Sequence, residues 1–600
     1  MAYTPRNLMV VLLMLFVGNL CGCYNTGKKD GQSHLDTGSN IDVDTDPNRD
    51  TITDSDRGTD SNFPVGQDTT SDSREGTPSD SGADTEEMPS DTEERQSDSV
   101  DTEEMQSDSV DTEEMPSDIV EVQSDSVDTE ETPSDSSADT DSDSFDTESG
   151  RESDDGCYPG NFYLTAIEDI DKLSEIVCIE GDLFIKTKEV QTIDLTNLET
   201  IGKTLQIGYN TVPLTLVFSR LTQVADISID GNTELSVSFP MLEQADAIRI
   251  DDNRSTRVDL SALKRAIDIT ASGNEESVEL SLVGLTTVDG ALSVIGNSAF
   301  PHLDLSALEQ VGEVNFSGLS ATETIDLRNL KSAQSIGLAS LDTVKTVQLE
   351  SLASVGKISI VANTLPTLVF SRLTQVTELS IVSNAETSVS FPALEQADSI
   401  GITGNRLTRV DLSALKRATD FFVAVNEESV ELSLDSLTTV DKDLSVSGDA
   451  TFRLLDFSVL EKVGGAVSFS GLSFTETIDL RNLKSAQRIS VAGTVKLETL
   501  QLESLASAGE IYIAGNNRLE SLEFPTLSAA ADGFGVHGNP MLSVLSIDAL
   551  TVVGGAFEVF GNGLLDCDPQ AIEGQFDSEV EMLVCGNLPN SACGEACPES

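Results

Sequence analysis

The residues of this 600-residue chain that could do chemistry are carboxylates and cysteines, since it has 104 Asp and Glu but three His. A polysaccharide-cleaving enzyme would need acidic and basic side chains clustered in one tuned site. The acidic residues instead recur in one phrase, D-L-x-x-L, at Asp259, Asp304, Asp326, Asp411 and Asp479. No G-x-S-x-G, H-E-x-x-H or phosphate-binding glycine loop appears, and scarce His removes the commonest acid–base group. The sequence favours a protein that is not an enzyme and needs no cofactor or metal, with a carbohydrate-active enzyme as the less favoured alternative.

The cysteines lie near the N-terminus and at the start and end of a repetitive region, residues 157–178 and 567–597, and are absent from the long middle of that region. In an exported protein an even set at the termini indicates disulfides. We expect Cys157 to pair with Cys178, and two bridges among the last four. The C-G-E-A-C sequence could suggest a metal site, but no His lies near it, and staples that cover the open ends of a stack are favoured. The disulfide candidates are Cys157, Cys178, Cys567, Cys585, Cys593 and Cys597.

Residues 1–22 have one basic residue, Arg6, and an apolar run too short to cross a membrane, which predicts an export signal. Leu20-Cys21-Gly22-Cys23 resembles the bacterial lipobox, which implies that Cys23 carries acyl chains that anchor the protein to a membrane. Tyr24, in place of the Asp found in some lipoproteins, suggests outer-membrane sorting by the same resemblance. An ordinary signal peptide is the alternative.

Residues 23–156 are rich in Asp, Glu, Ser and Thr, and include the recurring decapeptide D-T-E-E-M-x-S-D-S-V. Such a composition cannot form a core and predicts a disordered acidic stalk that self-repulsion keeps extended. The formal net charge of −69 excludes nucleic acid as a partner.

A phrase of about 22 residues recurs some eighteen times from Ile170 onward, with the skeleton L-x-x-(V/I/A)-x-x-φ-x-(I/V)-x-x-N-x-x-φ-x-φ-x-φ, where φ is apolar. Ile248 with Ile250, and Val258 with Leu260, alternate with polar residues, which predicts two short strands per repeat. Repeats of this kind stack as an all-β parallel solenoid of about 18 coils over residues 157–565, a rod roughly 85 Å long. The anchoring leucines are Leu173, Leu198, Leu221, Leu242, Leu263, Leu285, Leu308, Leu330, Leu352, Leu373, Leu394, Leu415, Leu437, Leu460, Leu483, Leu505, Leu527 and Leu550.

An Asn returns after the I-x-I segment of most repeats, and Asp449 replaces it once. We assign these residues to the fold, because a stacked Asn tolerates left-handed backbone and satisfies the turn amides of adjacent coils. The expected ladder comprises Asn210, Asn232, Asn253, Asn274, Asn297, Asn363, Asn384, Asn405, Asn426, Asn516, Asn539 and Asn562.

The segment from Cys157 to Asn210, with I-E-G-D-L-F-I and I-D-L-T-N-L-E-T-I-G-K-T-L-Q-I-G-Y-N, resembles the receptor L domain, a leucine-rich ligand-binding module. The resemblance implies a right-handed coil of parallel strands with a ligand-binding or adhesive role. It also implies that residues 566–600 form a Cys-containing end cap like that of the bacterial surface lipoproteins. The chain is longer than one such module and lacks Trp.

Residues 214–365 match residues 366–517 closely, so seven coils were duplicated as a unit. The copies differ mainly around the I-x-I-x-x-N strand, where neutral drift or ligand contact would give the same pattern. The ligand-binding candidates on its outward side are Asp230, Arg249, Asp251 and Ser293.

The sequence thus predicts a lipid-anchored, surface-exposed outer-membrane protein that binds or adheres through a long solenoid. Few aromatic residues favour a protein ligand over a carbohydrate. A structural spacer of the envelope without a specific ligand is the alternative.

Overall fold

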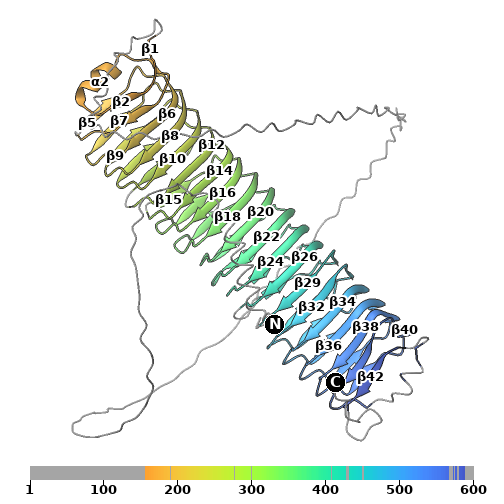
Figure 1. Cartoon of the computed structure of the whole chain (residues 1–600). Helices are drawn as coiled ribbons and strands as arrows, with labels where there is room; N and C mark the ends of the chain where they lie inside the picture. Colours follow the sequence, from red (N-terminus) through yellow and green to blue (C-terminus); the bar gives the residue numbers. More distant parts are fainter. Residues whose placement is uncertain are drawn as a thin grey trace, which may run out of the picture. The chain divides into compact units, whose positions relative to one another are not determined.

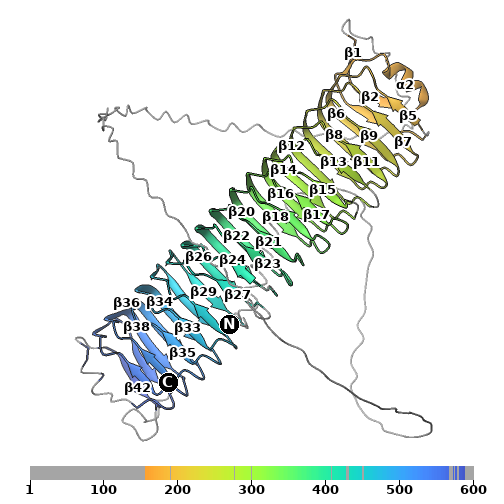
Figure 2. The same ribbon diagram turned by 180° about the vertical axis from the view of Figure 1, so that it is seen from behind.

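A computed structural model of the chain describes residues 156–188, 191–275, 278–298, 300–406, 409–426, 431–448, 452–566, 572, 575–576 and 580–587. These residues form a parallel β-solenoid of about 18 coils, as the sequence predicted. Figures 1 and 2 show the coils stacked one on the next, with long strands on one side and short strands on the other. The predicted signal peptide, Cys23 and the stalk up to residue 155 lie outside the described residues.

The long strands form one parallel sheet, called sheet A, in which each coil pairs with the coils before and after it. In the middle of the stack, for example, Ile248 is in register with Ile227 on one side and Ile269 on the other. The unbroken long strands are β6 (Thr200–Gly208), β8 (Gln223–Asp230), β10 (Gln244–Asp251), β12 (Arg265–Ser272), β14 (Thr287–Ile295), β16 (Gln310–Ser317), β18 (Ser332–Ala339), β20 (Ser354–Val361), β22 (Gln375–Val382), β24 (Gln396–Thr403), β26 (Arg417–Ala424), β34 (Ser485–Ala492), β36 (Ser507–Ala514) and β38 (Ala529–His537). Shorter members are β1 (Cys157–Tyr158), β2 (Phe162–Leu164), β3 (Cys178–Ile179), β4 (Leu183–Ile185), β28 (Thr439–Val440), β29 (Leu444–Ser447), β31 (Lys462–Val463), β32 (Ala466–Ser470), β40 (Val552–Val553), β41 (Phe557–Phe560) and β42 (Met582–Cys585).

The short strands lie on the other side of each coil and form five small parallel sheets. They are β5 (Gln191–Asp194), β7 (Leu214–Val217), β9 (Leu235–Ser238), β11 (Thr256–Asp259), β13 (Glu279–Ser281), β15 (His302–Asp304), β17 (Thr324–Asp326), β19 (Thr346–Gln348), β21 (Thr367–Val369), β23 (Ser388–Ser390), β25 (Arg409–Asp411), β27 (Glu431–Ser433), β30 (Leu454–Asp456), β33 (Thr477–Asp479), β35 (Thr499–Gln501), β37 (Ser521–Glu523) and β39 (Val544–Ser546).

In the first described coil, helix α2 (Ile167–Leu173) takes the place of a short strand. The expected Cys157–Cys178 disulfide is present and joins β1 to β3, whose residues 157 and 178 are in register. Helix and disulfide thus both lie at the start of the part of the stack that the structure describes.

Each coil fills its interior with apolar residues at the positions of the sequence skeleton. In the coil of β10, the buried side chains include Leu242, Ala245, Ile248 and Ile250. Only two residues separate Ala245 from Ile248, where one or three would keep the alternation, so the burial pattern slips by one position while the strand continues. The strand is therefore longer than the short I-x-I strand predicted from the sequence, and this part of the prediction was wrong.

Like side chains stack on like in the interior because the coils are in register. All the predicted anchoring leucines are buried, none more than 1% exposed. Phe218 stacks on Phe239 with ring centroids 5.0 Å apart, and the duplicated pair Phe370 and Phe391 stacks at 4.7 Å. The core is thus a set of continuous apolar columns along the solenoid axis.

The asparagines form a buried ladder. The amide nitrogen of Asn232 donates to the backbone oxygen of Ile207 at 2.9 Å and to Oδ1 of Asn253 at 3.0 Å. The backbone N–H of Asn232 also donates to Oδ1 of Asn253, at 3.0 Å. Asn232 therefore ties three successive coils together and satisfies backbone groups that the turn removes from water.

The sequence predicted that the Asn of this corner has the left-handed backbone. In the structure, the residue before the Asn has it instead. It is often Gly, as at Gly231 with φ of 64°, but Tyr209, Ala362 and Val425 also take φ between 50° and 57°. The Asn side chain then points inward along the axis, where its amide reaches the next coil.

The ladder is interrupted where other side chains occupy its position. Leu319 and Leu341 replace two rungs in the first duplicated copy, and Leu472 and Thr494 replace two in the second. Asp449 lies outside the described residues. At the C-terminal end the ladder continues to Asn587, which accepts from Asn562 at 3.0 Å.

The solenoid also extends past its predicted end at residue 565. Strand β42 pairs in parallel with β41, with Val559 in register with Val584. The predicted cap, residues 566–600, thus begins with another coil. Cys585 is disulfide-bonded, and Cys567, Cys593 and Cys597 lie outside the described residues.

We predict that replacing Asn384 with Ala destabilises the solenoid by about 2–4 kcal/mol, because buried donors and acceptors lose their partners. Its amide nitrogen donates to the backbone oxygen of Ile360 at 2.8 Å, and its Oδ1 accepts from the backbone N–H of Asn363 at 3.0 Å. Urea unfolding followed by circular dichroism measures the effect.

The matched control is Asn315→Ala. Asn315 is half-buried on the outer face of β16, and its side chain makes no hydrogen bond within the described residues. An equal loss of stability in both variants would contradict the ladder's role.

Candidate ligand-binding surface

The four predicted binding residues all lie on the outward face of sheet A. Asp230 ends β8, Arg249 and Asp251 lie two residues apart on β10, and Ser293 lies on β14. Asp251 is directly in register with Asp230. Ser293 is two strands from Arg249, with Thr270 between them. The structure therefore places Asp230, Arg249 and Asp251 close together. Ser293 lies two strands away, in the row of stacked residues that contains Arg249.

Asp251 is part of the fold as well as of the surface. Its Oδ1 accepts from the backbone N–H of Ser272 at 3.0 Å and from the Ser272 hydroxyl at 2.7 Å. Burial raises the pKa of Asp251, and the carboxylates of Asp252 and Asp230 act in the same direction, against the two hydrogen bonds. Its carboxylate is thus committed to the next coil.

Asp230 belongs to a small group that the sequence analysis missed. Its carboxylate raises the pKa of Tyr209, whose side chain is 58% exposed. The Lys186 ammonium lies 5.2 Å from the centroid of the Tyr209 ring. The ring also covers Gly231, where an added Cβ would lie 2.7 Å from it. Tyr209 was hidden in the sequence because it occupies a corner position that is often Gly.

Arg249 differs from most basic residues of the solenoid. Lys331 pairs with Glu309 at 2.7 Å and Lys416 with Glu395 at 2.8 Å, each across neighbouring coils. Arg249 is exposed and makes no ion pair or side-chain hydrogen bond to any described residue. It is the candidate whose charge is available to a ligand.

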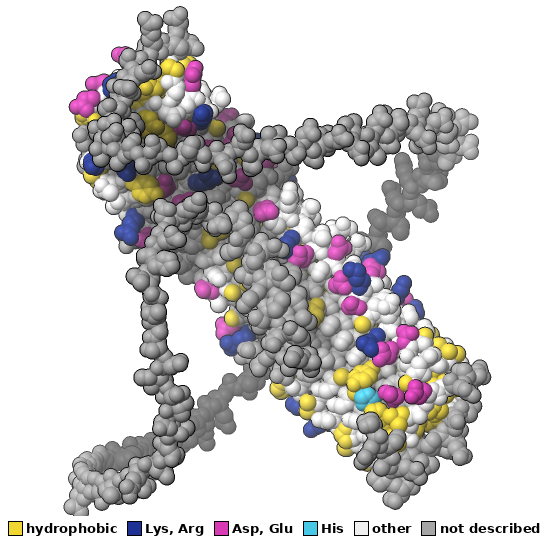
Figure 3. All heavy atoms as spheres, viewed as in Figure 1, with side chains coloured by type: hydrophobic (Ala, Val, Ile, Leu, Met, Phe, Trp, Pro, Cys, Tyr) yellow, Lys and Arg dark blue, Asp and Glu magenta, His cyan; other side chains and the backbone are white. Residues whose placement is uncertain are grey.

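Arg249 and Ser293 belong to a row of stacked side chains along the middle of this face, which we call the central outward row. Most of its members are small and uncharged, and Figure 3 shows wide areas of this face that are neither charged nor hydrophobic. From β6 to β41 the row is Gln206, Ser228, Arg249, Thr270, Ser293, Asn315, Gly337, Ser359, Ser380, Gly401, Phe422, Ser445, Ser468, Ser490, Tyr512, Gly535 and Glu558.

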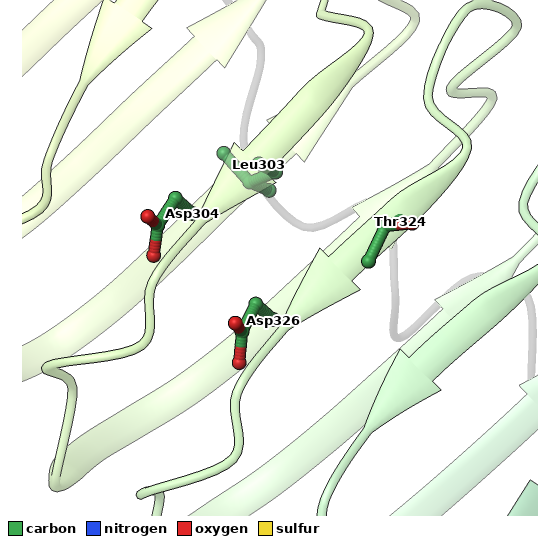
Figure 4. A pocket seen from close by; sticks show the side chains of 4 residues that line it. All are labelled: Leu303, Asp304, Thr324 and Asp326. Carbon is green, nitrogen blue, oxygen red and sulfur yellow. The ribbon is translucent and has the colours of Figure 1, made fainter.

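The short-strand side has a shallow depression of about 190 Å³ lined by Leu303, Asp304, Thr324 and Asp326. Figure 4 shows the two carboxylates side by side on neighbouring strands. Such a pair is what an acid–base site would require. Each carboxylate, however, caps its own turn: Asp304 accepts from the N–H of Ser306 at 3.0 Å, and Asp326 from that of Arg328 at 3.2 Å.

The surroundings of Asp326 favour the charged form of its carboxylate. Burial acts to raise the pKa of Asp326, but the Arg328 guanidinium and backbone N–H outweigh it and hold the pKa below its usual value. The carboxylates of Asp259, Asp411 and Asp479 cap the same turn in their coils, at 3.0–3.1 Å. The recurring D-L-x-x-L phrase is therefore a turn motif.

Among the described residues, no group of three or more His, Cys, Asp or Glu side chains is arranged to hold a metal ion. No helix in the described part of the chain has the length and apolar character to cross a membrane. Comparison with protein-family models and with curated proteins found no match to this chain.

We predict that Asp251→Asn stabilises the protein at pH 7, because the amide oxygen keeps the Ser272 hydrogen bonds and the buried charge is removed. A folded-state pKa above the usual value means that the protonated form contributes stability below that value, and that this is lost as pH rises through the folded pKa. The expected rise in melting temperature is about 1–2 °C at pH 7 and vanishes near the usual Asp pKa of about 4.

The control is Asp398→Asn, which changes the net charge equally at an exposed residue of β24, several coils away from Asp251. Thermal melts of both variants at pH 7 and at about pH 4 test this prediction. Equal rises in melting temperature in both variants would show that only net charge is involved.

Proposed function

We propose that this protein is a non-catalytic, lipid-anchored binding or adhesion protein of the bacterial outer membrane that displays sheet A to a ligand outside the cell. The observation that carries the proposal is the central outward row, a stacked line of mostly small, polar side chains that runs from β6 to β41 with its backbone in register. A surface of this kind suits contact with an extended partner, since successive coils offer equivalent positions.

The roles of the acidic side chains support binding rather than catalysis. The repeated aspartates of the short-strand side cap turns, and the acidic residues opposite lysines form exposed ion pairs between coils. These uses account for the carboxylates without an acid–base site. The resemblance of the N-terminal coils to the receptor L domain supports the same role.

The charge of the chain limits its partners. At a formal net charge of −69, a cationic protein ligand would be attracted to the molecule and an anionic polymer repelled. We therefore propose a protein ligand with basic groups at its contact surface, held in addition to the membrane contact made through Cys23.

The test is protease treatment of intact cells. We expect the solenoid from Cys157 onward to be digested while a periplasmic control protein survives, and Cys23→Ser to remove the protein from the membrane fraction and abolish its labelling by a tagged fatty acid.

Digestion only after the outer membrane is permeabilised would contradict surface exposure. It would favour the alternative of an envelope spacer without a specific ligand.

A further inference from the structure

The two duplicated copies differ at matched positions on the outer face of sheet A, although their buried positions agree. Ile229 of the first copy corresponds to Ile381 of the second, for example, and both are fully buried. Four outward positions instead lose a charge or gain an apolar side chain in the second copy. They are Asp230 and Val382, Arg249 and Gly401, Thr270 and Phe422, and Gly273 and Val425. The second copy therefore exposes an apolar surface where the first copy is charged.

This apolar surface lies on the neighbouring strands β22, β24 and β26, in the middle of the stack (Figure 1). Gly401 is in register with Ser380 on one side and with Phe422 on the other. The side chains of Phe422 and Val425 are 42% and 43% exposed. We call Val382, Gly401, Phe422 and Val425 the Gly401 patch.

The space above Gly401 is open. A Cβ added there would meet no atom of the described residues within 4 Å, and Gly401 is itself partly exposed. The first copy shows what this space can hold, because the matched residue Arg249 carries a long side chain on a strand of the same register. The second copy thus has room for one long side chain beside Phe422.

Val425 occupies its position against the preference of the backbone. Its φ is 50°, in the left-handed region that β-branched residues disfavour, and the matched Gly273 has a φ of 63°. Exposed apolar side chains that gather in one place mark contact surfaces. The stability of the solenoid does not account for an exposed Val at this corner, and a contact made by its side chain does.

We propose that the Gly401 patch binds one large apolar side chain of the protein ligand, such as Leu or Met, seated above Gly401 against Phe422. This deepens the proposed function, on which it rests for the identity of the ligand as a protein.

The charges at the border of the patch are paired within the solenoid. Two carboxylates lie on the same outward face, Glu378 of β22 and Asp420 of β26. Lys357 lies 3.1 Å from the first and Lys442 lies 3.2 Å from the second. The contact that the patch offers is therefore apolar, whereas the basic groups of the ligand are attracted by the acidic chain as a whole.

The size of the patch favours a single side chain over a second copy of this chain. A stable protein interface buries about 800 Å² per partner, from roughly 20–30 residues on each side. The Gly401 patch has four residues, and Ser380 and Ser445 border it in the central outward row. One apolar side chain of an extended segment matches this size.

The experiment titrates the full chain, made soluble by Cys23→Ser, with the peptide acetyl-Lys-Lys-Leu-Lys-Lys-amide at about 0.15 M salt. A matched peptide with Ser in place of Leu has the same charge, and maltohexaose serves as a neutral oligosaccharide. The methyl NMR signals of Val382 and Val425 are followed, assigned with Val382→Ile and Val425→Ile. They report on the patch and not on cation binding elsewhere on the acidic chain.

We expect the Leu peptide alone to shift these methyl signals. Phe422→Thr, which restores the residue of the first copy, should weaken binding about tenfold through the loss of one large apolar contact. Gly401→Arg, which likewise restores the first-copy residue, should abolish binding. Ala291→Arg, on the outer face of β14 several coils away, should leave it unchanged. Circular dichroism checks folding, and Phe422→Thr keeps the test valid if Gly401→Arg does not fold.

The proposal is overturned if the Leu peptide leaves the signals unshifted, if the Ser peptide or maltohexaose shifts them equally, or if Phe422→Thr binds as tightly as the parent. It is also overturned if the signals shift with protein concentration alone, because a second copy would then be the occupant. Peptide binding does not depend on location in the cell. Protection of the solenoid from protease would therefore contradict surface display and leave this result standing.

Discussion

The structure depends on one constraint: every coil must turn between its long and short strands while burying backbone N–H and C=O groups that no strand partner can reach. An orphaned buried polar group costs about 1–3 kcal/mol, and the turn recurs in each of about 18 coils. A left-handed residue followed by Asn meets this constraint, because the first redirects the chain and the second carries an amide that bonds the coils on both sides. Where Leu319 or Leu472 replaces the Asn, the position stays fully buried. The corner therefore accepts either a hydrogen-bonded Asn side chain or an apolar side chain.

The register that stacks the asparagines also stacks the side chains on the outer surface of the coils. In-register parallel coils place equivalent residues about 4.8 Å apart, which is favourable for Ser, Thr and Gly and unfavourable for like charges. The solenoid resolves most charge contacts by pairing opposite signs across coils, as in Lys331 with Glu309. These exposed pairs contribute little stability each, but they avoid columns of like charge. Asp230 beside Asp251 is a departure from this pattern, and the raised pKa of Asp251 is its consequence.

Much of this fold could be predicted from the sequence because its core positions repeat, with one Leu in each coil and an Asn in most coils. The full length of the long strands could not, since the slip between Ala245 and Ile248 breaks the period of two that identifies a strand. The left-handed corner was misplaced by one residue because Tyr209, Ala362 and Val425 hide its preference for Gly. Among the outward residues of sheet A, Arg249 and Asp230 were recognised from the sequence. Tyr512, Gly535 and Glu558 were not, because more than twenty residues separate each of them from the next. Counting back four positions from Asn516, Asn539 and Asn562 would have aligned all three.

The duplication affects the middle of the solenoid and leaves both ends single. The repeated unit ends at residue 517, so the coils of β38 and β41 lie beyond both copies and were not multiplied with them. In the central outward row the duplicated coils carry mostly small polar residues, with Arg249, Phe422 and Tyr512 as exceptions. Adding seven coils lengthens the solenoid by roughly 34 Å at 4.8 Å per coil without changing either end. If the chain is anchored at Cys23, that insertion increases the distance along the chain between the membrane and the C-terminal coils. The duplication therefore changes the reach of the solenoid independently of its end coils.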